Sequence, residues 1–228
     1  LHHLVAMMLY LCKRVRPDIH TTVAFLCTRV TAPDEDDYKK LARCVKYLRA
    51  YPDLKLTLEV NPDRVLEWWV DASFAVHPDM KGHTGAMMTM GKGATHTIST
   101  KQKINTKSST EAELVGVDDS LPTVIWARHF LMAQGFDVTD NIVYQDNQSA
   151  ILLEKNGRRS SGKKTRHIEI RYFFITDRIA QKHMKVEYCP TGEMNADAFT
   201  KPLQGSAFRK FRQRMLNLPN VSDTWDGS

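Results

Sequence analysis

The sequence predicts an α/β fold, in which a mixed sheet is covered by helices and preceded by a helical segment. Apolar residues recur at helical spacing over the first 50 residues, and the period changes to two after residue 53. Three meandering strands are then followed by alternating helices and strands. This order is typical of a mixed sheet with helices packed on it.

Length and composition allow one domain with an appendage, or two small domains. The 228 residues include 32 Lys and Arg against 26 Asp and Glu, a net charge of +6, and 42% of them are hydrophobic. This composition excludes wholesale disorder and weakly favours an anionic partner. The longest apolar run, Leu4–Cys12, is far shorter than the roughly 20 residues that a membrane span needs. We therefore expect no membrane partner.

The four cysteines form no C-x-x-C pair, which favours reduced, intracellular thiols over a zinc site or a disulfide framework. The chain opens on Leu1 rather than Met, so we expect it to be a fragment of something longer.

Three helices are expected before residue 50. The first runs from His3 to Val15, and the break at Arg16-Pro17-Asp18 starts a second helix that extends to about Val30. The third begins with the acidic run 34–37, whose carboxylates oppose the positive end of the helix dipole, and it ends near residue 49.

Strands are expected next. Residues 54–60 alternate between apolar and polar types, which predicts a strand, and residues 65–74 predict a second one. Residues 84–90 and 94–100 flank Gly91-Lys92-Gly93, which predicts a hairpin.

The rest of the chain alternates helices with strands. Residues 108–134 predict helix, and Pro122 within them marks either a kink or a break between two helices. The remaining elements are a strand over 141–145, a helix over 147–154, a helix over 165–182, a strand over 184–188 and two helical pieces after residue 193.

Three aspartates occupy positions that favour a cation nearby. Asp71 lies within an apolar strand pattern, Asp146 ends another, and Asp197 starts a helix after the last strand. A carboxylate buried at such a place is costly without a partner, so a cation or metal is expected close to it. Taken singly, each also fits a strand-end cap or a turn residue.

The helix that starts near residue 108 offers a fourth acid, either Glu111 or Glu113. Ser108 with Glu111 fits a capping box, and Thr110 with Glu113 fits one too. Glu113 shares a helical stripe with small and apolar residues, which mildly favours it as the inward acid.

These acids lie in five ordered strings that resemble the ribonuclease H region of copia-type LTR-retrotransposon polyproteins. The strings are W-V-D-A-S at 69–73, S-S-T-E-A-E-L at 108–114, Q-D-N-Q-S-A at 145–150, K-T-R-H-I-E-I-R at 164–171 and A-D-A-F-T-K-P-L at 196–203. The segment from L-Y-L at 9–11 to R-P-D-I at 16–19, with V-K-Y-L at 45–48, resembles the end of the reverse transcriptase just upstream.

The resemblance implies a ribonuclease H-like fold, a mixed five-stranded sheet flanked by helices. It implies a thumb- or connection-like end of reverse transcriptase over residues 1–60, a ribonuclease H domain over 61–205, and a C-terminal helix and tail over 206–228. The implied location is intracellular, in the cytoplasmic virus-like particle of a retrotransposon. The implied partners are an RNA–DNA hybrid and the remainder of the polyprotein.

The resemblance also selects Glu113 over Glu111 and implies an endoribonuclease that cuts the RNA strand of hybrids. Two Mg²⁺ ions, which Mn²⁺ is expected to replace, would be held by four acids that serve as both ligands and catalytic residues, Asp71, Glu113, Asp146 and Asp197. Asp71 is expected to bridge the ions. A histidine that precedes the last acid in cellular ribonucleases H has no counterpart here, since residues 187–197 contain none.

Nucleic-acid contacts are expected from residues next to the catalytic positions and from the basic stretch 155–171. Neutralising phosphates there would make affinity salt-dependent, whereas the alternative is a solvated loop. His167 fits a packed or capping role as well as substrate contact. The expected contact residues are Ser109, Asn147, Arg158, Arg159, Lys163, Lys164, Arg166 and His167.

Two alternatives to the nuclease remain open. One is a DDE-type integrase with the same fold, and the other is a degenerate module that only binds hybrids or assembles with the polyprotein. No Y-x-D-D strand turn occurs, so we expect no polymerase activity from this chain alone.

Overall fold

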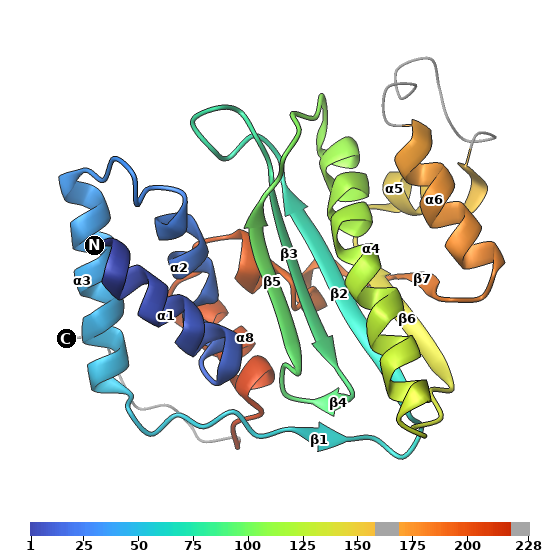
Figure 1. The fold of residues 1–228 in the computed structure, drawn as a ribbon, viewed down its shortest axis with the longest axis horizontal. Coiled ribbons are helices and arrows are strands. Elements are labelled where there is room, and N and C mark those ends of the chain that lie inside the picture. The colour runs from blue at the N-terminus through green and yellow to red at the C-terminus, as the bar shows by residue number, and fades with distance from the viewer. Residues whose placement is uncertain (158–168, 220–228) are drawn as a thin grey trace.

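The computed structural model of the chain describes residues 1–157 and 169–219. It places three N-terminal helices beside one edge of a central sheet, with further helices on the sheet (Figure 1). The N-terminal helices are α1 (His2–Arg14), α2 (His20–Cys27, after the short 3-10 turn η1, Pro17–Ile19) and α3 (Glu35–Ala50). They pack around a hydrophobic cluster of their own that includes Val5, Leu26 and Cys44.

The acidic run before α3 begins the helix as expected. Asp34 accepts a hydrogen bond from the backbone N–H of Asp37, and the Asp37 carboxylate accepts one from the N–H of Asp34. This reciprocal capping box satisfies two donors that a helix start leaves free. The acids of this turn thus have a structural role.

The central sheet has five strands in the order β5-β3-β2-β6-β7. The strands are β2 (Val65–Ser73), β3 (His83–Thr89), β5 (His96–Lys101), β6 (Asp140–Gln145) and β7 (Lys185–Tyr188). The pairs β2–β3 and β3–β5 are antiparallel, whereas β2–β6 and β6–β7 are parallel. This mixed, helix-flanked sheet of five strands confirms the predicted fold class.

Side chains of alternate residues on β2 enter two different cores. Trp68 and Val70 pack with Leu114 and Leu121 of α4 (Ser109–Ala133) in the main core. The second core, on the other face, unites β3 with α7 (Asp197–Thr200) and α8 (Gly205–Leu216), and its buried members include Met87, Phe199, Phe211 and Met215. The period-two pattern of a strand covered on both faces explains this division. The remaining helices are α5 (Gln148–Asn156), α6 (Glu169–Ala180) and the 3-10 turn η4 (Thr191–Glu193).

The strand predicted over residues 54–60 is wrong over most of its length. Only β1 (Glu59–Val60) is a strand, and it pairs with β4 (Gly91–Lys92) in a separate two-stranded sheet. Leu54 and Leu56 instead pack against the core formed with α7 and α8, and the N–H of Thr57 donates to the carbonyl of Leu216. The alternating apolar residues of this segment are therefore buried against α8 and do not form a paired strand.

Pro122 neither breaks nor divides its helix, because α4 is continuous from Ser109 to Ala133. Proline removes one N–H donor, which leaves the carbonyl four residues earlier without its helical partner. Pro122 lies on the exposed side of α4, where water can bond to that carbonyl. Within the described ranges, no helix combines the length and the apolar character that crossing a membrane requires.

Candidate metal centre

Three carboxylates converge at one end of the central strands. Asp71 lies near the end of β2, Asp146 directly follows β6, and Glu113 lies in the first turns of α4. Because β2 and β6 are parallel neighbours, their carboxyl ends reach the same edge of the sheet. One oxygen from each of the three acids lies within 4.8 Å of the others.

Glu111 and Glu113 have different roles in the structure. Glu111 belongs to the start of α4, since its Oε2 accepts from the N–H of Lys107 at 2.7 Å and its own N–H donates to Ser108 Oγ. Both side chains are buried, with 4% of Glu111 and 6% of Glu113 exposed, but Glu113 faces the strands, where the Gln145 amide donates to its Oε2 at 3.3 Å. Glu113, and not Glu111, therefore lies with Asp71 and Asp146.

Asp197, the fourth predicted acid, joins the cluster through Lys201. It begins α7, and the Nζ of Lys201 one turn later lies 2.6 Å from its Oδ1. The same Nζ lies 3.7 Å from Oδ2 of Asp71, to which the hydroxyl of Thr200 also donates. Lys201 thus links Asp197 to Asp71, which is a member of the group of three acids.

Burial and mutual repulsion raise the pKa values of these acids. Desolvation raises the pKa of Asp71 to about 6, and the charges of Asp197 and Asp146 add to this rise, whereas Lys201 and Thr200 oppose it. The pKa of Glu113 is raised well above its usual range by burial and then by Asp71 and Asp146. Burial also raises the pKa of Asp197 despite its bond to Lys201. Crowded, partly desolvated carboxylates of this kind gain stability from a bound cation.

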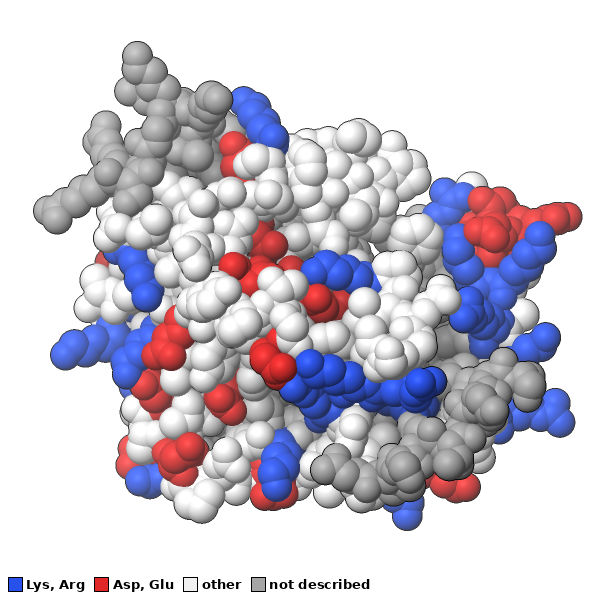
Figure 2. Space-filling view, turned by 180° about the vertical axis from the view of Figure 1, so that it is seen from behind, with Lys and Arg blue, Asp and Glu red and all other residues white. Residues whose placement is uncertain are grey.

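The donor set fits a hard divalent ion. Every side chain in the cluster offers carboxylate oxygen, the ligand that Mg²⁺ and Mn²⁺ prefer, and no cysteine or histidine belongs to the group of three. Asp71, Glu113 and Asp146 could hold one ion, and Asp71 with Asp197 could hold a second. On the side of the molecule shown in Figure 2, acidic side chains gather near the centre with basic side chains beside them.

Four polar residues outside the predicted set of acids and nucleic-acid contacts orient the acids. Gln145 is fully buried at the end of β6; its amide donates to Glu113, and its Oε1 accepts from the N–H of Asp146 at 2.9 Å. Thr191 of η4 donates to Oδ2 of Asp146 at 2.9 Å. Lys201 and Thr200 complete the set. Gln145, Thr200 and Lys201 lie within the strings that carry the resemblance, and Lys201 also follows Asp197 by four residues on one helix face, whereas Thr191 lies in none of those strings.

Only two of the eight predicted nucleic-acid contacts, Ser109 and Asn147, lie among the described residues. Ser109 is exposed at the first position of α4, four residues before Glu113. Asn147 caps α5, since its Oδ1 accepts from the N–H of Ala150 at 3.1 Å, so it has a structural role beside any substrate contact. Six predicted contacts lie outside the described residues: Arg158, Arg159, Lys163, Lys164, Arg166 and His167.

Arg171, at the end of the basic stretch, pairs with acids of α4. Its guanidinium forms an ion pair with Asp118 and lies 3.7 Å from Asp119. This residue therefore joins α6 to α4 and is not a free phosphate ligand in this structure.

The chain is similar to one part of several transposon polyproteins. It is 30% identical over 205 residues to the retrovirus-related Pol polyprotein from transposon TNT 1-94 of Nicotiana tabacum, covering 90% of this chain and 15% of the relative. It is 31% identical over 202 residues to that from transposon RE1 of Arabidopsis thaliana, covering 88% and 14%. The chain thus spans about one seventh of the length of the curated relatives it matches. No protein-family model matches it.

Two of the solved structures that are similar to this chain are described next. LC11-RNase H1, isolated from compost, is 13% identical with a TM-score of 0.46, over 60% of this chain and 92% of that chain. The protease-reverse transcriptase of prototype foamy virus is 10% identical with a TM-score of 0.41, over 69% and 21%.

Proposed function

The chain is a homologue of one segment of copia-type retrotransposon Pol polyproteins, and on this premise we propose that it is a metal-dependent endoribonuclease. Its substrate is the RNA strand of RNA–DNA hybrids formed during reverse transcription. It acts as part of the larger polyprotein, in the virus-like particle of the element.

One observation carries the proposal: the sheet edge gathers Asp71, Glu113 and Asp146 within 4.8 Å, and Asp197 lies next to them through Lys201. Phosphodiester hydrolysis by two ions needs such a set, because bound divalent ions supply an activated water and stabilise the leaving oxygen. Asp71 would contribute to both ion positions, which its proximity to Glu113, Asp146 and Lys201 supports.

The surrounding residues hold these ligands in place. Gln145 fixes Glu113 and the backbone of Asp146 from within the core, and Thr191 holds the outer oxygen of Asp146. Lys201 neutralises the repulsion between Asp71 and Asp197, and those two carboxylates raise its pKa despite its partial burial. The ligands are therefore oriented before a substrate arrives, which keeps the cost of ordering them out of the reaction.

The test is cleavage of a labelled RNA–DNA hybrid by the whole chain with Mg²⁺ or Mn²⁺. Asp71→Asn and Asp146→Asn should each abolish cleavage, while Glu35→Gln, on a side chain 93% exposed on α3, should leave the rate unchanged. Asp71→Asn also removes a desolvated charge from a crowded cluster, so its melting temperature in metal-free buffer should not fall. Undiminished cleavage in either Asn variant would overturn the site.

Parallel substrates separate the alternatives. Strand transfer on duplex DNA ends without hybrid cleavage would identify an integrase-type activity. Salt-sensitive binding of the hybrid with no turnover under either metal would identify a module that only binds or assembles.

A further inference from the structure

The helix that carries Asp197 cannot hold its own position. α7 has four residues, Asp197 to Thr200, and its N-cap residue Ala196 provides no side-chain hydrogen bond. Isolated helices shorter than about 12 residues are unstable in water, because a single turn does not offset the cost of its own nucleation. The position of Asp197 is therefore set by what contacts α7 from outside.

Two hydroxyl groups from distant parts of the chain hold consecutive carbonyls of α7. Thr21 of α2 donates from its Oγ1 to the carbonyl of Ala198. Ser99 of β5 donates from its Oγ to the carbonyl of Phe199 at 2.8 Å, and this bond is buried. The His20 ring, also from α2, packs against the Phe199 ring in a T-shaped arrangement with centroids 6.0 Å apart. Groups from α2 and from the sheet thus both hold α7.

Ser99 is itself held by a chain of two buried histidines. His83 Nε2 lies 2.8 Å from Ser99 Oγ, and His83 Nδ1 lies 3.0 Å from Nε2 of His77. Since Ser99 donates onward to Phe199, the network assigns the proton of each ring to Nε2. Burial lowers the pKa of His83 to about 4 and also lowers that of His77, so both rings are neutral at pH 7.

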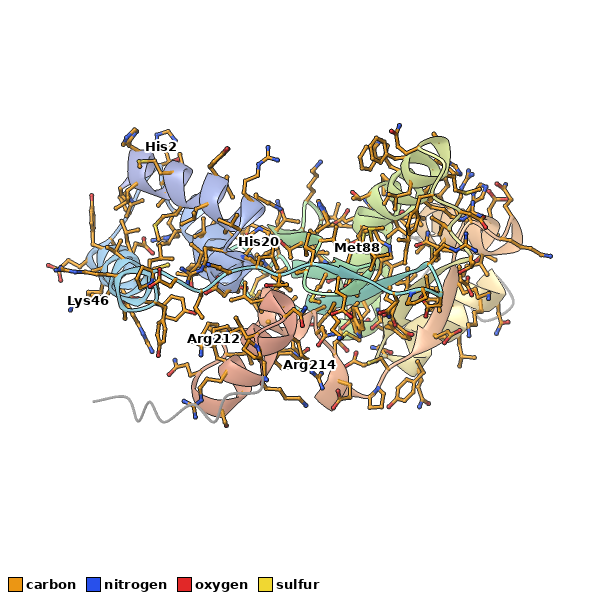
Figure 3. All side chains as sticks on the ribbon, turned by 90° about the horizontal axis from the view of Figure 1, so that it is seen from below. His2, His20, Lys46, Met88, Arg212 and Arg214 are labelled. Atoms are coloured by element: carbon orange, nitrogen blue, oxygen red, sulfur yellow. The ribbon has the colours of Figure 1, made fainter. Side chains whose placement is uncertain are left out.

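The histidine chain ends on α2 again. The His77 ring stacks on Phe25 with centroids 5.8 Å apart and an interplanar angle of 15°. α2 is also tied to β5, because His20 Nδ1 lies 2.9 Å from Thr97 Oγ1, and α1 contacts the same residue, because Lys13 Nζ donates to the Thr97 carbonyl at 2.8 Å. His20 lies where the N-terminal helices meet the strands (Figure 3).

We propose that α2 is a positioning element for Asp197, acting through Thr21 on Ala198 and through Phe25, His77, His83 and Ser99 on Phe199. The N-terminal helices, which resemble the end of a reverse transcriptase, then form part of the framework of the metal centre. The inference rests on the proposed function only where metal binding is used to detect it.

Thr21→Val in the whole chain is the first test, because it keeps the shape of the side chain and removes the donor to Ala198. Loss of one hydrogen bond of typical strength should speed amide exchange across α7 about fivefold, measured by mass spectrometry on the peptide that contains the Phe199 and Lys201 amides. Thr21→Ser should restore the exchange rate. The matched control is Thr28→Val, whose exposed hydroxyl donates to the Phe25 carbonyl of its own helix.

The second readout is Mn²⁺ binding. It is measured as the decrease in the electron paramagnetic resonance signal of the free ion when Mn²⁺ binds to the chain. Thr21→Val and Ser99→Ala should each weaken the binding that depends on Asp197 by about tenfold, the usual effect of removing support behind a ligand. Thr28→Val should bind as the unchanged chain does. Ser99→Ala also serves if Thr21→Val does not fold.

The outcomes separate the two proposals. The inference is overturned if two results hold for both Thr21→Val and Ser99→Ala. These are that the α7 amides exchange at the rate of the unchanged chain, and that the variant binds Mn²⁺ with the affinity of the unchanged chain. If the variants loosen α7 while the unchanged chain fails to cut hybrids, the inference stands and the nuclease proposal fails.

Discussion

Gly85→Ala should reduce hybrid cleavage by displacing α7. Gly85 lies on β3 directly opposite Asp71, and α7 packs against the space where its side chain would be. A Cβ there would lie 2.6 Å from Thr200 Cγ2, against 3.4 Å for ordinary contact, and the Thr200 methyl could in part rotate away. It would also lie 2.9 Å from the Phe199 Cβ and 3.0 Å from the Ala196 carbonyl oxygen, which cannot rotate away. α7 must therefore shift by several tenths of an ångström.

The shift separates Thr200 and Lys201 from Asp71 and moves Asp197 away from the other acids. A misplacement of about 1 Å can cost roughly a hundredfold in rate, so a shift of half that size should lower cleavage about tenfold. Overpacking should also lower the free energy of unfolding by about 1–3 kcal/mol. Initial rates on a labelled hybrid at saturating Mg²⁺, together with thermal unfolding, measure both effects.

Gly192→Ala is the matched control. A Cβ on Gly192 meets nothing within 4 Å, although this residue follows Thr191, which holds Asp146. Its cleavage rate should stay within about twofold of the unchanged chain, since it requires no shift of neighbouring atoms. Equal rates in the unchanged chain and Gly85→Ala would refute the reasoning, because they would show that the position of α7 does not matter for cleavage.

Three further predictions follow from buried charges. The pKa of Asp71 is raised from 3.8 to about 6 mainly by burial, so the metal-free chain should lose stability as pH rises through that window, and Mg²⁺ should raise the melting temperature more at pH 7.5 than at pH 5. Glu154 is fully buried without a hydrogen-bond partner among the described residues, and burial raises its pKa from 4.5 to about 8. The advantage in melting temperature of Glu154→Gln over the unchanged chain should therefore grow between pH 5 and 8. Arg16→Met leaves the buried Asp18 carboxylate without its cation and should cost about 3–5 kcal/mol in urea unfolding, whereas Lys39→Met on an exposed pair should cost less than about 1 kcal/mol.

Each of these has a clear contrary result. An Mg²⁺ effect on melting that is independent of pH would show that proton release from the acids is not linked to metal binding. A constant difference between Glu154→Gln and the unchanged chain would mean that Glu154 does not titrate differently on folding. A small effect of Arg16→Met would show that Asp18 is solvated or finds another donor, such as the Tyr47 hydroxyl that already bonds to it.

Three of the four proposed ligands could be selected from the sequence because their chemistry conflicts with their local pattern. Asp71 and Asp146 interrupt or end apolar strands, and Glu113 lies on an apolar stripe of its helix, so each predicts a carboxylate that needs a cation. Gln145 could not be predicted in the same way, since one glutamine at a strand end forms no pattern. Its importance arises only when parallel pairing brings β6 next to the helix that carries Glu113.

The incorrect strand prediction over residues 54–60 also arises from contacts between distant parts of the chain. Leu54 and Leu56 do alternate with polar residues, but the surface that buries them comes from α8, more than 150 residues later in the chain. Likewise, nothing in the sequence around Thr21 links it to Ala198, a residue 177 positions away. Periodicity indicates that one face of a segment is buried. Only the tertiary fold determines which other segment covers that face.

The parallel pairing of β2 with β6 and the docking of α7 also determine when the metal centre forms. Thr200 and Asp71, which contact each other in the finished site, are 129 residues apart. At about 5–20 residues per second, a ribosome takes roughly 6 to 26 seconds to make the chain between them. Throughout that time the nascent chain carries an incomplete set of acids. The nuclease activity that we propose would therefore be one of the last properties that this segment acquires during its synthesis.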